Sequence, residues 1–85
     1  MKINVKYFAS VREAVGAGSE SLELPESVAT VGAVRALLVA RGGAWGEALG
    51  EQRAVRMACD QVMCGPETAV NDGAEVAFFP PVTGG

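Results

Sequence analysis

The amino-acid sequence predicts an α+β fold in which one main amphipathic helix packs on a mixed sheet of about five strands. Three observations support this prediction. Segments that alternate between apolar and polar residues occur near both ends of the chain, a stretch with helical periodicity lies between them, and glycine and proline signals separate these segments. The 85 residues suffice for one domain, and 49% hydrophobic and 20% charged residues are typical of a chain that folds.

The first strand is predicted at residues 2–8, where apolar and polar residues alternate. One face carries Ile3, Val5 and Tyr7, and the other carries polar side chains together with Phe8. Because a half-buried strand turns its polar face to solvent, Phe8 is expected outside the core.

A short helix and a second strand are expected next. Ser10 can cap the helix, Glu13 completes a capping box, and Gly16 can end the helix in a left-handed conformation. Residues 21–25, SLELP, alternate again and end in a proline, which predicts a strand. We expect this strand to pair antiparallel with the first, with the short helix in their connection.

The main helix is predicted within residues 30–43, TVGAVRALLVARGG. Thr30 caps its start, and Gly42 and Gly43 stop it. The stripe that faces the core consists of Val31, Val34, Leu37 and Leu38. Gly32 weakens the first turn by roughly 1 kcal/mol relative to alanine.

The connection after the main helix, residues 44–52, is spaced by glycines and can hold one further helical turn. Trp45 lies at its start. We expect this large side chain to seal the edge of the core rather than to stack on a ligand.

Two short strands are predicted at residues 54–59 and 62–68, with a tight turn at Asp60 and Gln61. A two-residue turn fixes the pairing of these strands. The resulting register places Met63 on the outer face, as a second apolar side chain outside the core.

The same register makes Cys59 and Cys64 diagonal neighbours, roughly 7–8 Å apart. This separation is too large for an unstrained disulfide. Since the sequence contains two cysteines and no histidine, a closed zinc site is not predicted, and neither is a catalytic triad. We interpret the two cysteines as core residues and expect no metal.

The last strand follows Asp72 and Gly73, a strong turn signal. Its alternation directs Val76 and Phe78 toward one face and Phe79 toward the other. If the first and last strands lie parallel and adjacent in the middle of the sheet, the fold is the ubiquitin-like β-grasp.

Charge and hydropathy limit the classes of partner. The formal net charge is −3 and the sequence pI is about 4.8, so the chain lacks the basic surface that nucleic-acid binding requires. No signal-peptide pattern and no apolar run of membrane-spanning length occurs in the sequence. We therefore expect a cytoplasmic protein whose partners are proteins or small molecules.

The chain ends in FFPPVTGG, residues 78–85. Pro80 and Pro81 cannot donate hydrogen bonds to a sheet, and they hold the following chain in an extended form. The predicted boundaries are a folded domain at residues 1–79 and an extended Gly-Gly tail at residues 80–85.

Three stretches carry a family resemblance: VKYFASVREAVG, VATVGAVRALL and, most specifically, DGAEVAFFPPVTGG. With these motifs the sequence resembles the small subunits of molybdopterin synthase, which belong to the ubiquitin-like sulfur carriers. The resemblance spans essentially the whole chain and implies the β-grasp fold.

The resemblance implies that Gly85 carries the chemistry. A terminal carboxylate, with a pKa of roughly 3.5, is ionised and unreactive as an acyl group at neutral pH. In this family an adenylating enzyme, related to the ubiquitin-activating enzymes, joins the carboxylate to AMP from ATP, and a sulfur donor protein converts the adenylate into a thiocarboxylate. The large synthase subunit uses two such sulfurs to build the molybdopterin dithiolene. No cofactor is expected on this chain, because the activating enzyme consumes the ATP.

The resemblance also implies the contact residues and the assembly, a heterotetramer of two small and two large subunits. The residues expected to enter the partner ahead of Gly85 are Pro80, Pro81, Val82, Thr83 and Gly84. The hydrophobic patch expected to bind both the large subunit and the activating enzyme consists of Phe8, Met63 and Phe79, and Arg12 matches a further contact position.

Other functions share some of these features. A sulfur carrier for another product, such as thiazole, cysteine or a thiolated tRNA, would have the same fold and the Gly-Gly end. A protein modifier would form isopeptide bonds to lysines through Gly85. A purely structural interaction domain is the least favoured, since it would not need a free glycine terminus.

Overall fold

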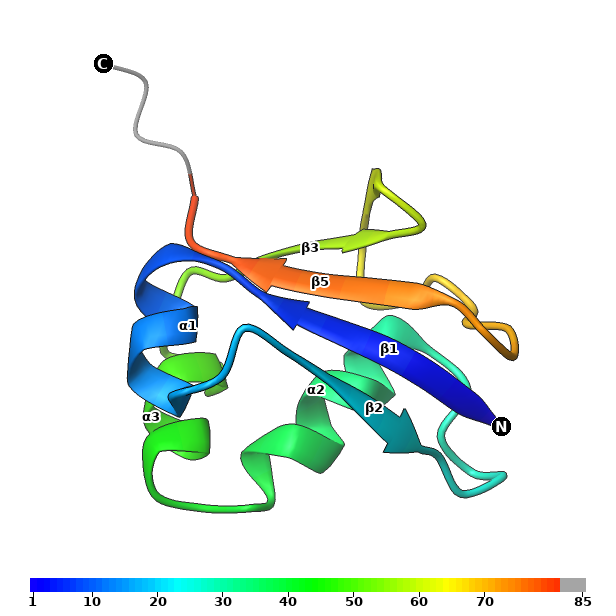
Figure 1. Cartoon of the computed structure of the whole chain (residues 1–85), viewed down its shortest axis with the longest axis horizontal. Coiled ribbons are helices and arrows are strands. Elements are labelled where there is room, and N and C mark those ends of the chain that lie inside the picture. Colours follow the sequence, from blue (N-terminus) through cyan, green and yellow to red (C-terminus); the bar gives the residue numbers. More distant parts are fainter. Residues whose placement is uncertain (82–85) are drawn as a thin grey trace.

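The computed structural model describes residues 1–81, which form a five-stranded sheet with helices on one side (Figure 1). The elements of this part of the chain are β1 (Lys2–Tyr7), α1 (Ala9–Val15), β2 (Ser19–Glu23), α2 (Val31–Val39), α3 (Ala44–Leu49), β3 (Arg56–Cys59), β4 (Val62–Cys64) and β5 (Glu75–Phe79). The expected further turn at residues 44–52 is therefore a helix of its own, α3.

The strand order is β2-β1-β5-β3-β4. The first and last strands, β1 and β5, are parallel neighbours in the middle of the sheet, and Val5 lies opposite Val76. The other pairings, including the predicted one between β1 and β2, are antiparallel. This arrangement is the ubiquitin-like β-grasp, so the predicted fold class is confirmed.

The core lies between the sheet and α2. Alternation along β1 and β5 turns one set of side chains toward the helices, and α2 contributes one stripe. The fully buried members of these three elements are Ile3, Val5, Tyr7, Val31, Val34, Leu38, Val76 and Phe78. Leu37, also predicted for the stripe, is only partly buried at the margin of this core.

The start of α1 differs from the prediction. The helix begins directly after Phe8, whose extended backbone forms the N-cap, so Ser10 lies inside the helix and caps nothing. The reason is the sheet: the Phe8 N–H donates to the carbonyl of Phe78 at 3.2 Å, which holds Phe8 at the junction of strand and helix. The predicted end is confirmed, because Gly16 adopts φ 76° and its N–H donates to the Arg12 carbonyl.

The contacts at the start of α2 explain why a glycine, which weakens a helix, occurs at position 32. Thr30 caps the helix as predicted, since its hydroxyl accepts from the Ala33 N–H at 3.1 Å. The Gly32 N–H donates to the carbonyl of Pro66 at 2.8 Å, and a Cβ added at Gly32 would lie only 2.9 Å from that oxygen. The residue thus allows the segment after β4 to approach α2 closely.

The β3–β4 hairpin has the predicted register, in which Cys59 lies opposite Val62 and Met57 opposite Cys64. The turn residues Asp60 and Gln61 both have positive φ, at 50° and 68°, as a two-residue hairpin turn requires. Both cysteines are free and partly buried against the core, which agrees with their interpretation as packing residues.

Candidate functional site

The candidate site begins where β1 and β5 end together. Because these strands are parallel and Tyr7 lies opposite Phe78, the next residues, Phe8 and Phe79, lie side by side at the same end of the sheet. Phe78 is completely buried, whereas Phe8 is 46% exposed and Phe79 partly exposed. The two aromatic residues that the sequence predicted outside the core are therefore neighbours in space.

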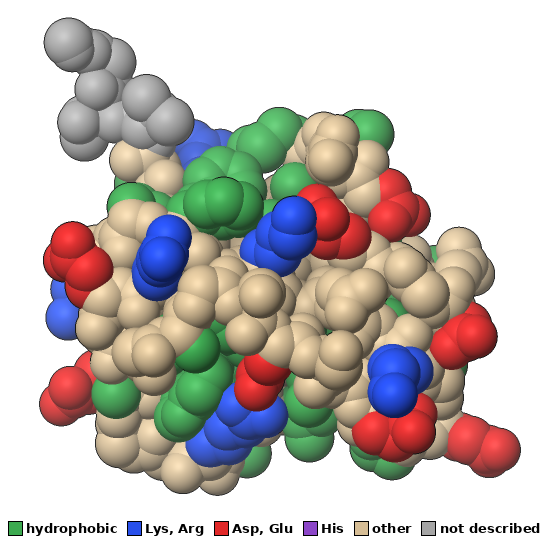
Figure 2. Space-filling view, viewed as in Figure 1, with side chains coloured by type: hydrophobic (Ala, Val, Ile, Leu, Met, Phe, Trp, Pro, Cys, Tyr) green, Lys and Arg blue, Asp and Glu red, His purple; other side chains and the backbone are tan. Residues whose placement is uncertain are grey.

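A row of small residues connects these aromatics to Met63. Met63 on β4 lies opposite Ala58 on β3, and Ala58 lies opposite Ala77 on β5. All of them face away from the helices; Met63 is 58% exposed, whereas Ala58 and Ala77, at 7% and 8%, are buried between their neighbours on this face. We call this surface the outer patch: it consists of Phe8, Ala58, Met63, Ala77 and Phe79. Figure 2 shows hydrophobic side chains gathered beside the root of the tail.

Basic side chains flank the outer patch. Arg56 lies opposite Phe79, and Lys6 lies opposite Ala77 and pairs with Glu75 at 3.3 Å. Arg12 stands one helical turn from Phe8 but leans against Gly18, beside the patch rather than on it. Arg12 was predicted as a contact residue, whereas Lys6 and Arg56 were not, because their places beside the patch follow from the pairing of distant strands.

The tail leaves the domain next to the outer patch. β5 ends at Phe79, as predicted, and Pro80 and Pro81 are partly buried at this end of the sheet. Figure 1 shows this point of departure beside the junction of β1 and α1. The other predicted tail residues, Val82, Thr83, Gly84 and Gly85, lie outside the described residues.

Two titratable side chains, Cys59 and Tyr7, have a raised pKa. Burial, and then the nearby Asp60 charge, raises the pKa of the Cys59 thiol, which keeps it protonated at neutral pH. Burial and a 2.8 Å hydrogen bond to Glu20 raise the pKa of the Tyr7 hydroxyl.

No group of three or more His, Cys, Asp or Glu side chains within residues 1–81 is placed to hold a metal ion. None of the helices described is long and apolar enough to span a membrane.

The chain resembles solved and curated proteins along its whole length. It is 42% identical over 83 residues to the molybdopterin synthase sulfur carrier subunit of Haemophilus influenzae and 41% identical to that of Escherichia coli; each alignment covers 98% of this chain and 99% of the relative. A complex of subunits 1 and 2 of the molybdopterin-converting factor from Helicobacter pylori contains a chain with the same fold, with a TM-score of 0.70, 21% identity and full coverage of both chains.

The match to a sequence family agrees with these similarities. Residues 5–85, which include every residue of the outer patch and the Gly-Gly end, match the ThiS family. With this match and the two relatives above, the chain belongs to the ThiS family.

Proposed function

We propose that this protein is the sulfur-carrier small subunit of a molybdopterin synthase in molybdenum cofactor biosynthesis. The observation that carries the proposal is the identity of 41–42% over nearly the full length to two such subunits. The position of the outer patch beside the root of the tail supports it, because a carrier must be recognised by its surface while its terminus reacts elsewhere.

The chemistry takes place at the carboxyl group of Gly85. An adenylating enzyme transfers AMP from ATP to this carboxylate and releases pyrophosphate. Sulfur at the oxidation level of sulfide, supplied by a donor protein, then displaces AMP and gives a thiocarboxylate. The thiocarboxylate delivers its sulfur to the cyclic pterin precursor and becomes a carboxylate again by taking an oxygen from water. Glycine suits this position because, without a Cβ, it threads a narrow channel in the partner. The chain itself binds no cofactor in this scheme.

The large synthase subunit is the partner that receives the tail. The complex of two molybdopterin-converting factor subunits from Helicobacter pylori, whose matching chain has this fold, supports this assignment. We propose further that the assembly contains two small and two large subunits, that residues 1–79 dock through the outer patch, and that residues 80–85 enter the large subunit.

Intact mass spectrometry tests the proposal. Incubation with the adenylating enzyme, ATP and a sulfur donor is expected to raise the mass of the chain by the difference between one sulfur and one oxygen atom. A variant that ends at Thr83 is the control and is expected to show no shift and an unchanged melting temperature. Absence of the mass shift in the full chain would refute the proposal. Lysine-linked adducts in its place would support the alternative function, a protein modifier conjugated through Gly85.

A further inference from the structure

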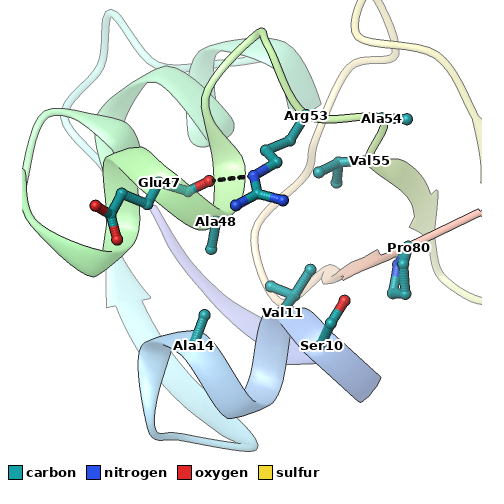
Figure 3. Close-up of a pocket in the computed structure, with 9 residues that line it drawn as sticks. All are labelled: Ser10, Val11, Ala14, Glu47, Ala48, Arg53, Ala54, Val55 and Pro80. Carbon is teal, nitrogen blue, oxygen red and sulfur yellow. Dashed lines mark hydrogen bonds between the residues drawn. The ribbon is translucent and has the colours of Figure 1, made fainter.

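A cavity of about 360 Å³ opens between α1 and α3, beside the end of β5 (Figure 3). Its apolar walls include Val11 and Ala14 from α1, Ala48 from α3 and Val55 from the segment before β3. Pro80, the first residue after β5, also lines it. The cavity is separate from the outer patch but continuous with the root of the tail, so a protein that receives the tail comes close to it.

The side chain of Arg53 places a positive charge at this cavity. The Nε of Arg53 donates to the Glu47 carbonyl at 2.9 Å, and the Arg53 carbonyl accepts from Arg35 at 3.2 Å. The first contact orients the guanidinium of this exposed residue, and the second holds its backbone. In Figure 3 the terminal nitrogens of Arg53 point into the cavity and the Glu47 carboxylate points away from it. The Ser10 hydroxyl, which caps no helix, also points toward the cavity.

The charge of this region is opposite to that of the whole chain. The protein carries a net charge of −3, yet Arg53 lines the cavity beside Pro80 and Arg56 lies opposite Phe79, the last residue of β5. Neither arginine belongs to an ion pair within residues 1–81, where the basic partners are the N-terminus, Lys6 and Arg41. This part of the surface therefore complements an acidic one, and Arg53 is the arginine that lines the cavity beside Pro80.

We propose that the cavity receives a carboxylate side chain of the large subunit, held by the Arg53 guanidinium and the Ser10 hydroxyl, when the tail is inserted. The inference rests on the proposed function. A guanidinium with its Nε already occupied presents two further nitrogens, which match the two oxygens of a carboxylate. The apolar walls accommodate the methylene groups of an aspartate or glutamate and strengthen the ion pair by excluding water.

The competing occupant is the chain's own terminal carboxylate. Pro80 lines the cavity and Pro81 follows it, and two consecutive prolines favour an extended chain over a tight return. For this reason we assign the cavity to the partner and treat occupation by Gly85 as an outcome of the test.

Isothermal titration of the large subunit with the full chain, at about 0.1 M and about 0.5 M NaCl, tests the inference. Arg53→Gln is expected to raise Kd about tenfold at the lower salt concentration and less at the higher one. Ala14→Leu, which fills the cavity from an exposed position, is expected to raise Kd at both salt concentrations. Lys2→Gln removes the same charge at an exposed position at the other end of β1, where Lys2 belongs to none of the ion pairs within residues 1–81, and is expected to change Kd less than twofold.

The outcomes separate this inference from the proposed function. Normal binding of the wild-type chain together with a less than twofold effect of Arg53→Gln overturns the inference alone. Failure of the wild-type chain to bind the large subunit overturns both. A change of the Gly85 amide resonance in the free Arg53→Gln variant would place the chain's own terminus in the cavity and would also overturn the inference.

Discussion

The two faces of the sheet are built by the same strands, but helices cover only one of them within residues 1–81. On the face toward the helices, Val5, Val76 and Phe78 are completely buried under α2. On the opposite face, Phe8 and Met63 stay 46% and 58% exposed, and no helix of residues 1–81 covers them. The first face stabilises the fold, whereas the second leaves apolar area available to another protein.

Phe78 and Phe79 show this difference most clearly, because they are adjacent in sequence and chemically identical. Alternation along β5 directs one into the core and the other onto the outer patch. The exposure of an aromatic side chain here therefore follows from its position along the strand and not from its chemical identity. Four predictions test it, from the largest expected effect to the smallest.

Phe78→Ala is expected to lower the free energy of unfolding by about 3–5 kcal/mol, because it removes a fully buried aromatic ring and leaves a cavity. Urea denaturation followed by circular dichroism measures this change. A loss below about 1 kcal/mol would show that the helix-covered face does not carry the stability.

Phe79→Ala is expected to act on binding instead. The affinity for the large subunit should fall by about 2 kcal/mol, roughly thirtyfold, as for an aromatic anchor at an interface. The free energy of unfolding should change by less than about 1 kcal/mol. Titration calorimetry and urea denaturation of the same preparation measure both quantities, and unchanged affinity would refute the role of the outer patch.

Met63→Ala is expected to weaken binding by about 1 kcal/mol, since Met63 lies at the margin of the outer patch on the edge strand β4. Val62→Ala is a matched control, because Val62 is its neighbour on β4, is 66% exposed and points to the other side of the strand. Equal effects of the two substitutions in the same titration would contradict the assignment of faces.

The smallest effect concerns the alkaline limit of stability. Burial raises the pKa of Tyr7 in the folded state above its unfolded value, which is about 10. The folded state therefore retains this proton when the unfolded state loses it, and stability falls as the pH rises above about 10. Tyr7→Phe is expected to be less stable at neutral pH and to show a shallower alkaline loss in urea denaturation. An identical fall of the free energy of unfolding with pH in both proteins would contradict the assignment of this fall to the Tyr7 hydroxyl.

Local patterns were sufficient for the order of most elements and for the side on which key residues lie. The bounds differ: the strand predicted at 21–25 is Ser19–Glu23, and the strand predicted at 62–68 ends at Cys64. Alternation with a period of two residues predicted that Phe78 and Phe79 lie on opposite faces of the sheet. The two-residue turn at Asp60 and Gln61 predicted the register of β3 and β4. The predicted cap at Ser10 was wrong because the capping pattern is local, whereas the bond from Phe8 to Phe78 joins opposite ends of the chain.

The cavity at Arg53 could not be predicted from the sequence. Its walls come from α1, α3, the segment before β3 and the end of β5, and no periodicity relates these positions. Gly32 is a similar case: its helix propensity suggested a weak first turn, but contact with Pro66 determines why glycine is needed there. Both features depend on how elements pack, which propensities do not describe.

The sequence by itself determined the face of the sheet on which the side chains of β1, β3, β4 and β5 lie, because alternation and turn residues act within a few residues. Only the tertiary structure decided which of these side chains meet. The parallel pairing of β1 and β5 places Phe8 beside Phe79, and Ala58 and Ala77 link them to Met63. Strand pairing is selected by the apolar area that the whole domain buries, and that area depends on contacts between residues far apart in the chain.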